Sequence, residues 1–299
     1  MITMVRSKTM TDKFGEIALV VLLSAIALGS LAPIWHTFAV SFSDKASAAA
    51  GFVTFWPKGF NVYSYEKILD DPAFLNAFLT SVKRVLLGGA IQFLLTVLMA
   101  YPLSREPKEF RLRNGYMWFL VFTMLFSGGI IPLYIVVKSL GLFNSIWSLV
   151  LPGAVPVFNV ILLMNFFRSI PKELNEAGYM DGAGPWFTLF RIYVPLSAPA
   201  LATVTLFSVV GHWNAFFDGM IFMRSVELYP LQTYIQQLVV QLNVTQLAND
   251  PNKLDMLAKL SNKTLNAAKI AVSMIPILLV YPFLQKYFIH GIMLGSVKE

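Results

Sequence analysis

The sequence predicts an all-α protein that crosses a membrane several times. Hydrophobic residues make up 57% of the 299-residue chain, charged residues 13%, and the mean hydropathy is +0.65. Soluble domains carry about 25% charged residues. Several apolar runs also reach the roughly 20 residues that a helix needs to cross a hydrocarbon core of about 30 Å. This composition excludes an ordinary soluble enzyme and a disordered chain, and the lack of cysteine excludes a disulfide scaffold.

Six apolar runs predict six transmembrane helices in a single domain that spans residues 1–299. We expect them at about residues 17–42, 78–103, 116–137, 146–167, 197–217 and 267–288. The first run is longer than the roughly 7–15 apolar residues of a signal peptide, so we expect it to be retained. Prolines within several runs predict kinks, which helix bundles tolerate where neighbouring groups satisfy the freed carbonyls.

The distribution of basic residues predicts that both termini are cytoplasmic. An even number of spans places the two ends on one side, and short loops rich in Lys and Arg face the cytoplasm. The loop after the second run contains Arg105, Lys108, Arg111 and Arg113, whereas the short loop at the opposite side contains Lys138 alone. We therefore attribute the net charge of +7 to basic residues that set the orientation in the membrane and contact anionic lipid. No sequence motif suggests nucleic-acid binding.

Two long external loops follow from this topology, at residues 43–77 and 218–266. The first contains Trp56 and predicts a partly ordered cap, and the second contains spaced leucines that predict short amphipathic helices. The second loop is expected to be either a plain surface cap or a docking element for an external partner. Lys83 and Arg84, at the start of the second helix, are expected to extend towards the outer interface.

The cytoplasmic segment 168–195 is the most informative part of the chain. Pro171 suits a first helical turn, Gly182 and Gly184 are expected to end that helix, and Pro185 to open a second one. The result is a helix–turn–helix with small residues at its tip. Small side chains permit the close approach of another surface, so the hairpin is either tucked under the bundle or offered to a partner.

One run in this segment resembles the EAA coupling motif of ATP-binding-cassette importer permeases. The matching residues are Glu176, Ala177, Gly178, Asp181, Gly182 and Ala183. Gly178 stands where the family usually has a second alanine, which implies a more flexible helix. The Tyr101-to-Arg105 stretch and the Trp213-Asn214 pair resemble other family motifs. The tail resembles that of the MalG-type branch, at Gly295, Ser296, Val297 and Lys298. The likeness covers nearly the whole chain and is closest to permeases for oligosaccharides, including alginate oligosaccharides.

The resemblance implies a type I importer permease fold in the bacterial cytoplasmic (inner) membrane. It implies a second homologous permease, two ATP-binding subunits that hold ATP and Mg²⁺, an external solute-binding protein and an oligosaccharide substrate. The motif helix and the tail would contact the ATPase subunits. The chain itself is not expected to be an enzyme or to bind a cofactor or metal, because it contains no Gly-x-x-x-x-Gly-Lys phosphate loop and its three histidines show no metal-ligand spacing.

Polar and aromatic residues within the predicted spans are candidates for the substrate path. They are Tyr134, Asn159, Asn165, Trp213 and Asn214. Sugars are bound through hydrogen bonds and aromatic faces, but each residue also has a structural interpretation, such as an interhelical hydrogen bond or a place in the interfacial aromatic belt.

Two other functions remain open at this point. An ion-coupled secondary transporter would require ionisable groups in mid-membrane and inverted repeats, which are not evident here. An ATP-binding-cassette permease for a non-sugar solute would share the hairpin and differ in its substrate.

Overall fold

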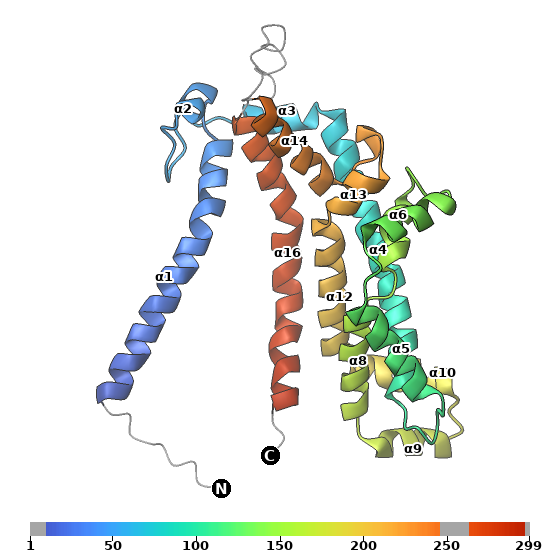
Figure 1. The fold of residues 1–299 in the computed structure, drawn as a ribbon. Coiled ribbons are helices and arrows are strands. Elements are labelled where there is room, and N and C mark those ends of the chain that lie inside the picture. The colour runs from blue at the N-terminus through green and yellow to red at the C-terminus, as the bar shows by residue number, and fades with distance from the viewer. Residues whose placement is uncertain (1–9, 246–262, 297–299) are drawn as a thin grey trace. The chain divides into compact units, whose positions relative to one another are not determined.

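The computed structural model describes residues 10–245 and 263–296; most of those residues are helical, and none of them lies in a β-strand. The chain divides into two compact units, Met1–Asp70 with Leu247–Val272, and Asp71–Gln246 with Ser273–Glu299. Each unit is described by itself below. Figure 1 shows the course of the helices.

The first unit contains the long helix α1 (Met10–Ser41) and the short helices α2 (Lys45–Ala49) and α3 (Tyr63–Leu69). Asp44 caps α2, since its carboxylate accepts a hydrogen bond from the Ser47 N–H at 2.9 Å. This contact also holds the pKa of Asp44 below its usual value. The start of α16 (Lys263–Ser296) belongs to this unit, and the helix continues into the second.

The second unit is built around α4 (Pro72–Ser104), which packs against α8 (Val157–Ser169) and α12 (Ala198–Asn214). Asp71 caps α4, accepting hydrogen bonds from the Ala73 and Phe74 N–H groups. The other elements are α5 (Arg113–Leu125), α6 (Ile130–Ser139), α7 (Ile146–Val150), η1 (Leu151–Gly153), α9 (Lys172–Met180), α10 (Pro185–Phe187), η2 (Thr188–Tyr193), α11 (Val194–Leu196), α13 (Phe217–Phe222), η3 (Val226–Leu228) and α14 (Leu231–Thr245).

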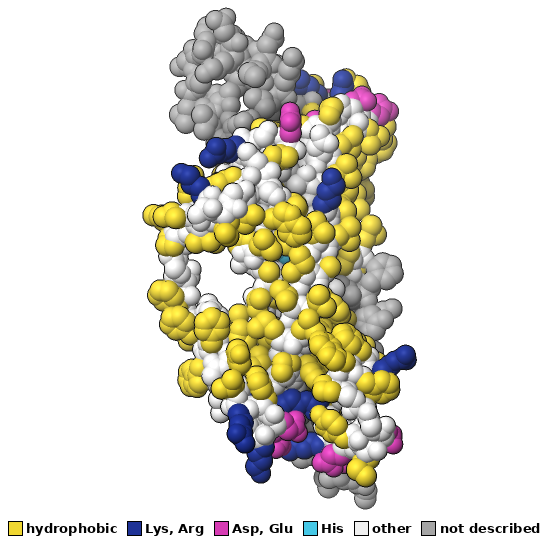
Figure 2. Space-filling model, turned by 90° about the vertical axis from the view of Figure 1, so that its right-hand side faces the viewer, with side chains coloured by type: hydrophobic (Ala, Val, Ile, Leu, Met, Phe, Trp, Pro, Cys, Tyr) yellow, Lys and Arg dark blue, Asp and Glu magenta, His cyan; other side chains and the backbone are white. Residues whose placement is uncertain are grey.

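The main hydrophobic core lies where α4, α8 and α12 meet the segment after α9. Its fully buried members include Ala100, Val160, Leu163, Phe167 and Val204. In Figure 2 hydrophobic side chains cover the middle of the visible face, while Lys, Arg, Asp and Glu gather near its two ends. That distribution suits a molecule whose middle lies in lipid.

Among the described residues, three helices are long and apolar enough to cross a membrane, at Lys13–Ser41, Pro72–Ser104 and Lys263–Pro282. Three bent pairs pass the same test, so the number of spans reaches six if each pair is one span. The expected range 116–137 is not one helix, because α5 and α6 meet at 110°. Gly129, at φ +84°, permits the break. The range 197–217 corresponds to α12, and residues 185–196 turn away from it by 84°.

Candidate coupling hairpin and transport pocket

The hairpin expected at residues 168–195 is present. Helix α9 ends where Gly182 adopts φ +79°, and the Ala183 N–H donates to the Gly178 carbonyl at 2.9 Å. A positive φ is accessible to glycine at little cost, so the residue type explains the stop. Pro185 then opens α10, as expected. The hairpin lies at the end of the second unit opposite α13 and α14 (Figure 1).

The six motif residues lie together around the C-terminal half of α9 and the turn that follows. Glu176, Ala177, Asp181 and Gly182 are exposed, whereas Gly178 is buried beneath Ile192. The apolar face of α9 is also exposed, and Met180 is 88% accessible. Leu174, Ala177, Gly178, Asp181 and Gly182 line a groove of about 440 Å³ together with Ala183, Gly184, Phe187 and Ile192. The chain therefore presents an apolar groove flanked by carboxylates at this end.

Aromatic contacts connect the end of α4 to the segment after α9. The Arg105 guanidinium lies 4.4 Å from the centroid of the Tyr101 ring and 5.0 Å from that of Tyr193. It also donates a hydrogen bond to the Tyr101 hydroxyl. The Tyr193 ring meets the edges or faces of Tyr101 and Phe167 at centroid distances of 5.3 and 5.4 Å. The Tyr101-to-Arg105 motif thus packs on η2, a pairing that sequence spacing alone did not indicate.

Arg168 and Lys172 attach the hairpin to the same end of α4, where Arg113 of α5 also binds. Arg113 Nε and Arg168 Nη2 both donate to the Leu103 carbonyl, at 2.9 and 3.2 Å. Cations there also complement the negative end of the helix dipole. Lys172, the first residue of α9, forms an ion pair with Glu106. The hydrogen bond and charge of Lys172 lower the pKa of Glu106, and Glu106 raises the pKa of Lys172.

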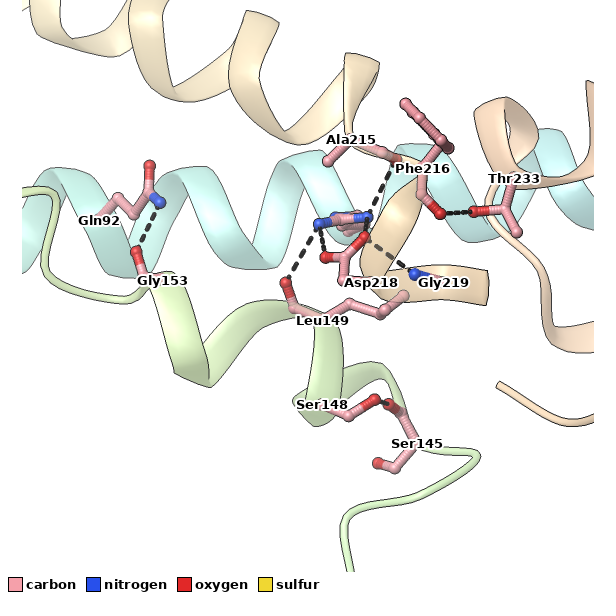
Figure 3. Close-up of polar contacts among 11 residues, drawn as sticks. Gln92, Ser145, Ser148, Leu149, Gly153, Ala215, Phe216, Asp218, Gly219 and Thr233 are labelled. Carbon is pink, nitrogen blue, oxygen red and sulfur yellow. Dashed lines mark hydrogen bonds and ion pairs between the residues drawn. The ribbon is translucent and has the colours of Figure 1, made fainter. Parts of the chain in front are cut away.

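A second hollow, of about 480 Å³, lies among α4, α7, α8, α12 and α13. Arg84 lines it and is 3% exposed. Its guanidinium forms an ion pair with Asp218 and donates to the carbonyls of Ala215 and Leu149 at 3.2 and 3.4 Å. Figure 3 shows these acceptors converging from α7, the α12–α13 turn and α13. The prediction that Arg84 extends to the outer interface is wrong, because the side chain is buried and pairs with Asp218, 134 residues further along the chain.

Two side-chain amides in this pocket have hydrogen-bond partners within the chain, whereas the buried His212 Nε2 has none among the described residues. Gln92 Nε2 donates to the Gly153 carbonyl at 2.7 Å (Figure 3). Asn159 Nδ2 lies 3.3 Å from both the Val204 carbonyl and the Ser208 hydroxyl. Of the five residues suggested for the substrate path, Asn159 alone lines the pocket. Gln92, Ser208 and His212 join it, and no motif in the sequence had singled them out.

The remaining path candidates lie elsewhere. The Trp213 indole N–H donates to the Ser273 carbonyl at 3.0 Å and holds α12 against α16. Tyr134 packs edge to face on Phe143, with ring centroids 5.0 Å apart. Asn165 and Asn214 are exposed. Within the tail motif, Gly295 and Ser296 end α16, while Val297 and Lys298 lie outside the described residues. Leu247 and the other leucines that were expected to form short helices in the second external loop also lie outside them.

Comparison with known protein families assigns the chain to one of them. The model of the family described as "binding-protein-dependent transport system inner membrane component" matches residues 74–293, which include the pocket and the hairpin. The chain belongs to this family. It is accordingly an inner-membrane protein of a binding-protein-dependent transport system, and the family and structural matches support the expected type I permease fold.

Relatives extend the match over nearly the whole length. The polygalacturonan/rhamnogalacturonan transport system permease protein YtcP of Bacillus subtilis (strain 168) is 37% identical over 97% of this chain and 100% of its own. Protein LplC of the same organism is 35% identical, with 97% of both chains covered. A crystal structure of a bacterial ABC transporter involved in the import of the acidic polysaccharide alginate contains a similar chain. That chain shows a TM-score of 0.84 and 32% identity, covering 95% of this chain and 99% of that one.

Proposed function

We propose that this chain is a non-catalytic permease subunit of an ATP-driven oligosaccharide importer. In this proposal it pairs with a second, homologous permease and receives its substrate from an external solute-binding protein. Two partner subunits bind ATP and Mg²⁺ and hydrolyse the nucleotide. Both termini and the hairpin face the cytoplasm. The observation that carries the proposal is the exposed groove of the hairpin, which is lined by five of the six motif residues, all but Glu176.

The contacts of the hairpin suit it to pass movement into the bundle. An ATPase subunit seated in the groove would press on α9, whose buried residues are Asn175 and Gly178. From α9 the ion pair of Lys172 and the packing of Tyr193 lead to the end of α4. Helix α4 packs along α8 and α12, so a displacement of its end would reach the pocket. The tail, Gly295–Lys298, is proposed as a second ATPase contact.

The pocket suits a ligand that offers hydroxyl groups. Its single guanidinium among the described lining residues already faces Asp218, so the pair is close to neutral and does not favour one sign of ligand charge. The amides of Gln92 and Asn159 and the hydroxyl of Ser208 are groups that can exchange partners with sugar hydroxyls. YtcP is named for the transport of polygalacturonan and rhamnogalacturonan and the structural neighbour for the import of alginate, which supports an oligosaccharide substrate here.

The proposal is tested by purifying the transporter under mild detergent and measuring which subunits remain together. The unmodified chain should retain a second permease and an ATPase, and the reconstituted complex should import a labelled oligosaccharide with ATP. Ala177→Trp fills the groove from an exposed position and should release the ATPase while the bundle stays folded. Lys108→Trp, at an exposed position at the same end that does not line the groove, should leave the ATPase bound.

Two results would contradict the proposal. Retention of the ATPase and of uptake by Ala177→Trp would remove the groove from the coupling path. A chain that transports alone in liposomes, driven by an ion gradient, would instead be a secondary transporter. Import of a non-sugar solute by an otherwise normal complex would leave the coupling intact and correct the substrate.

A further inference from the structure

The segment between α2 and α3 folds back along the last turns of α1. The Trp35 indole N–H donates to the Phe55 carbonyl at 2.6 Å, and His36 Nε2 lies 3.2 Å from the Val53 carbonyl. The Trp35 and Trp56 rings meet edge to face with centroids 5.7 Å apart. Residues 53–56 therefore lie beside Trp35 and His36, and not beyond the end of α1 at Ser41.

The base of the segment is fixed at the end of α1 as well. The Asp44 N–H donates to the Lys58 carbonyl at 2.9 Å, and the Asn61 N–H to the Phe42 carbonyl at 3.0 Å. The Val53 side chain is buried with Ala39 and Ala48. At about 1.5 Å per residue, the five or six residues from Trp35 or His36 to Ser41 place the tip roughly 8–9 Å back along the helix.

This depth coincides with the edge of the hydrocarbon core. No Lys, Arg, Asp or Glu occurs from Ile17 to Phe42. A helix crosses the core with about 20 residues, so a span counted from Ile17 ends at His36. The tip of the segment is hydrogen-bonded at that level, on the side of the membrane away from the N-terminus.

The side chains at the tip are those found at membrane interfaces. Phe52, Phe55 and Trp56 are 62%, 65% and 72% exposed. Residues 51–62 contain no carboxylate and one cation, Lys58, which lies 5.5 Å from the centroid of the Phe52 ring. Aromatic rings concentrate at the level of the lipid headgroups, and lysines extend from there towards phosphates.

We propose that residues 52–56 form an interfacial anchor that inserts into the lipid at the outer end of α1. Lipid is the occupant assigned because the exposed aromatic surface is continuous, through the contact of Trp56 with Trp35, with the apolar surface of α1, which carries no Lys, Arg, Asp or Glu from Ile17 to Ser41. The anchor sets the depth of α1 in the bilayer. Its chemistry does not depend on which solute is transported, nor on the coupling role of the hairpin.

Spin labelling tests the proposal, because the chain contains no cysteine. A nitroxide is attached at Phe55→Cys in the full chain, assembled with its partners in phosphatidylcholine vesicles, and its collisions with oxygen and with a water-soluble nickel chelate are measured. Leu23→Cys on α1 provides the reference inside the core and Glu66→Cys on α3 the aqueous one. The complex with the unmodified, cysteine-free chain is treated in the same way, and any signal from it measures the label attached to the partner subunits.

The label at Phe55→Cys should collide with oxygen several times more often, relative to nickel, than the label at Glu66→Cys. Thr54→Cys is the second labelling site, for the case that the substitution at Phe55 disturbs folding, because it keeps every aromatic side chain. Its ratio of oxygen to nickel collisions should also exceed that of the label at Glu66→Cys. A ratio equal to that at Glu66→Cys would mean a loop in water and overturn the proposal. Low collision rates with both reagents would mean that protein covers the segment, and this also overturns it.

Discussion

At Gly88 the backbone of α4 lies against the ring of His212 on α12. A Cβ atom at residue 88 would stand 2.4 Å from His212 Nε2, whereas at Gly89 it would meet nothing within 4 Å. Gly88→Ala is therefore expected to destabilise the fold by about 1–3 kcal/mol through overpacking. Gly89→Ala should stabilise it by up to about 1 kcal/mol, since alanine favours a helix. Thermal unfolding in detergent compares them, and equal shifts would disprove the close approach.

Two glycines of the hairpin should respond in opposite ways to the same substitution. At Gly178 a Cβ would lie 3.1 Å from the tip of the Ile192 side chain, which can move, so Gly178→Ala should strengthen α9 by up to about 1 kcal/mol. Gly182 has open space around it but φ +79°, so Gly182→Ala should cost about 1–2 kcal/mol from backbone strain alone. Hydrogen exchange of the α9 amides measures both. Protection that rises in both variants, or falls in both, would show that backbone strain does not distinguish the two glycines.

Between elements, the pair of Lys172 and Glu106 joins α9 to the loop after α4. The lowered pKa of Glu106 means that the pair is present above the usual carboxyl pKa and is lost as pH falls through the lowered one. The raised pKa of Lys172 preserves the pair until pH passes above that raised value. The strength of the ion pair should therefore not change around neutral pH. Salt should weaken the pair, because both groups are exposed to solvent.

Lys172→Glu is expected to reduce uptake several-fold while the complex still hydrolyses ATP, since two like charges would push α9 from the end of α4. The double variant Lys172→Glu with Glu106→Lys restores opposite charges and should recover most of the uptake. Lys108→Glu changes charge at an exposed site in the same loop and is the control. If the double variant is no better than Lys172→Glu alone, the pair does not carry the movement.

At the scale of the whole molecule, the break between α5 and α6 requires a covering partner. Residues 126–129 are not helical, and Leu125 and Ile131 beside them are 79% and 71% exposed. Irregular backbone at membrane depth is stable where protein or water surrounds it, because its polar groups have no partners in lipid. The proposed second permease would supply that cover. The co-purification experiment therefore tests the assembly that completes this fold, as well as its coupling to ATPase subunits.

Much of the fold could be predicted from sequence, because its signals are local. The length of the apolar runs predicts six spans, and the described residues contain three single helices of that kind, or six if each bent pair is one span. Gly182 and Pro185 predict the turn of the hairpin, because the conformations of glycine and proline are set by the residue itself. The break within residues 116–137 was not predicted, because a straight helix and a helix that turns at a glycine can have the same run of apolar residues.

What only the tertiary structure decided is which distant groups meet. Arg84 reads as an interfacial cation until the fold brings Asp218 beside it. Arg113 and Arg168 share the Leu103 carbonyl, and Tyr193 joins Tyr101, through packing that no local pattern specifies. A charged or polar side chain takes its role from the partner within hydrogen-bond reach, and that partner is chosen by how α4, α8 and α12 pack together.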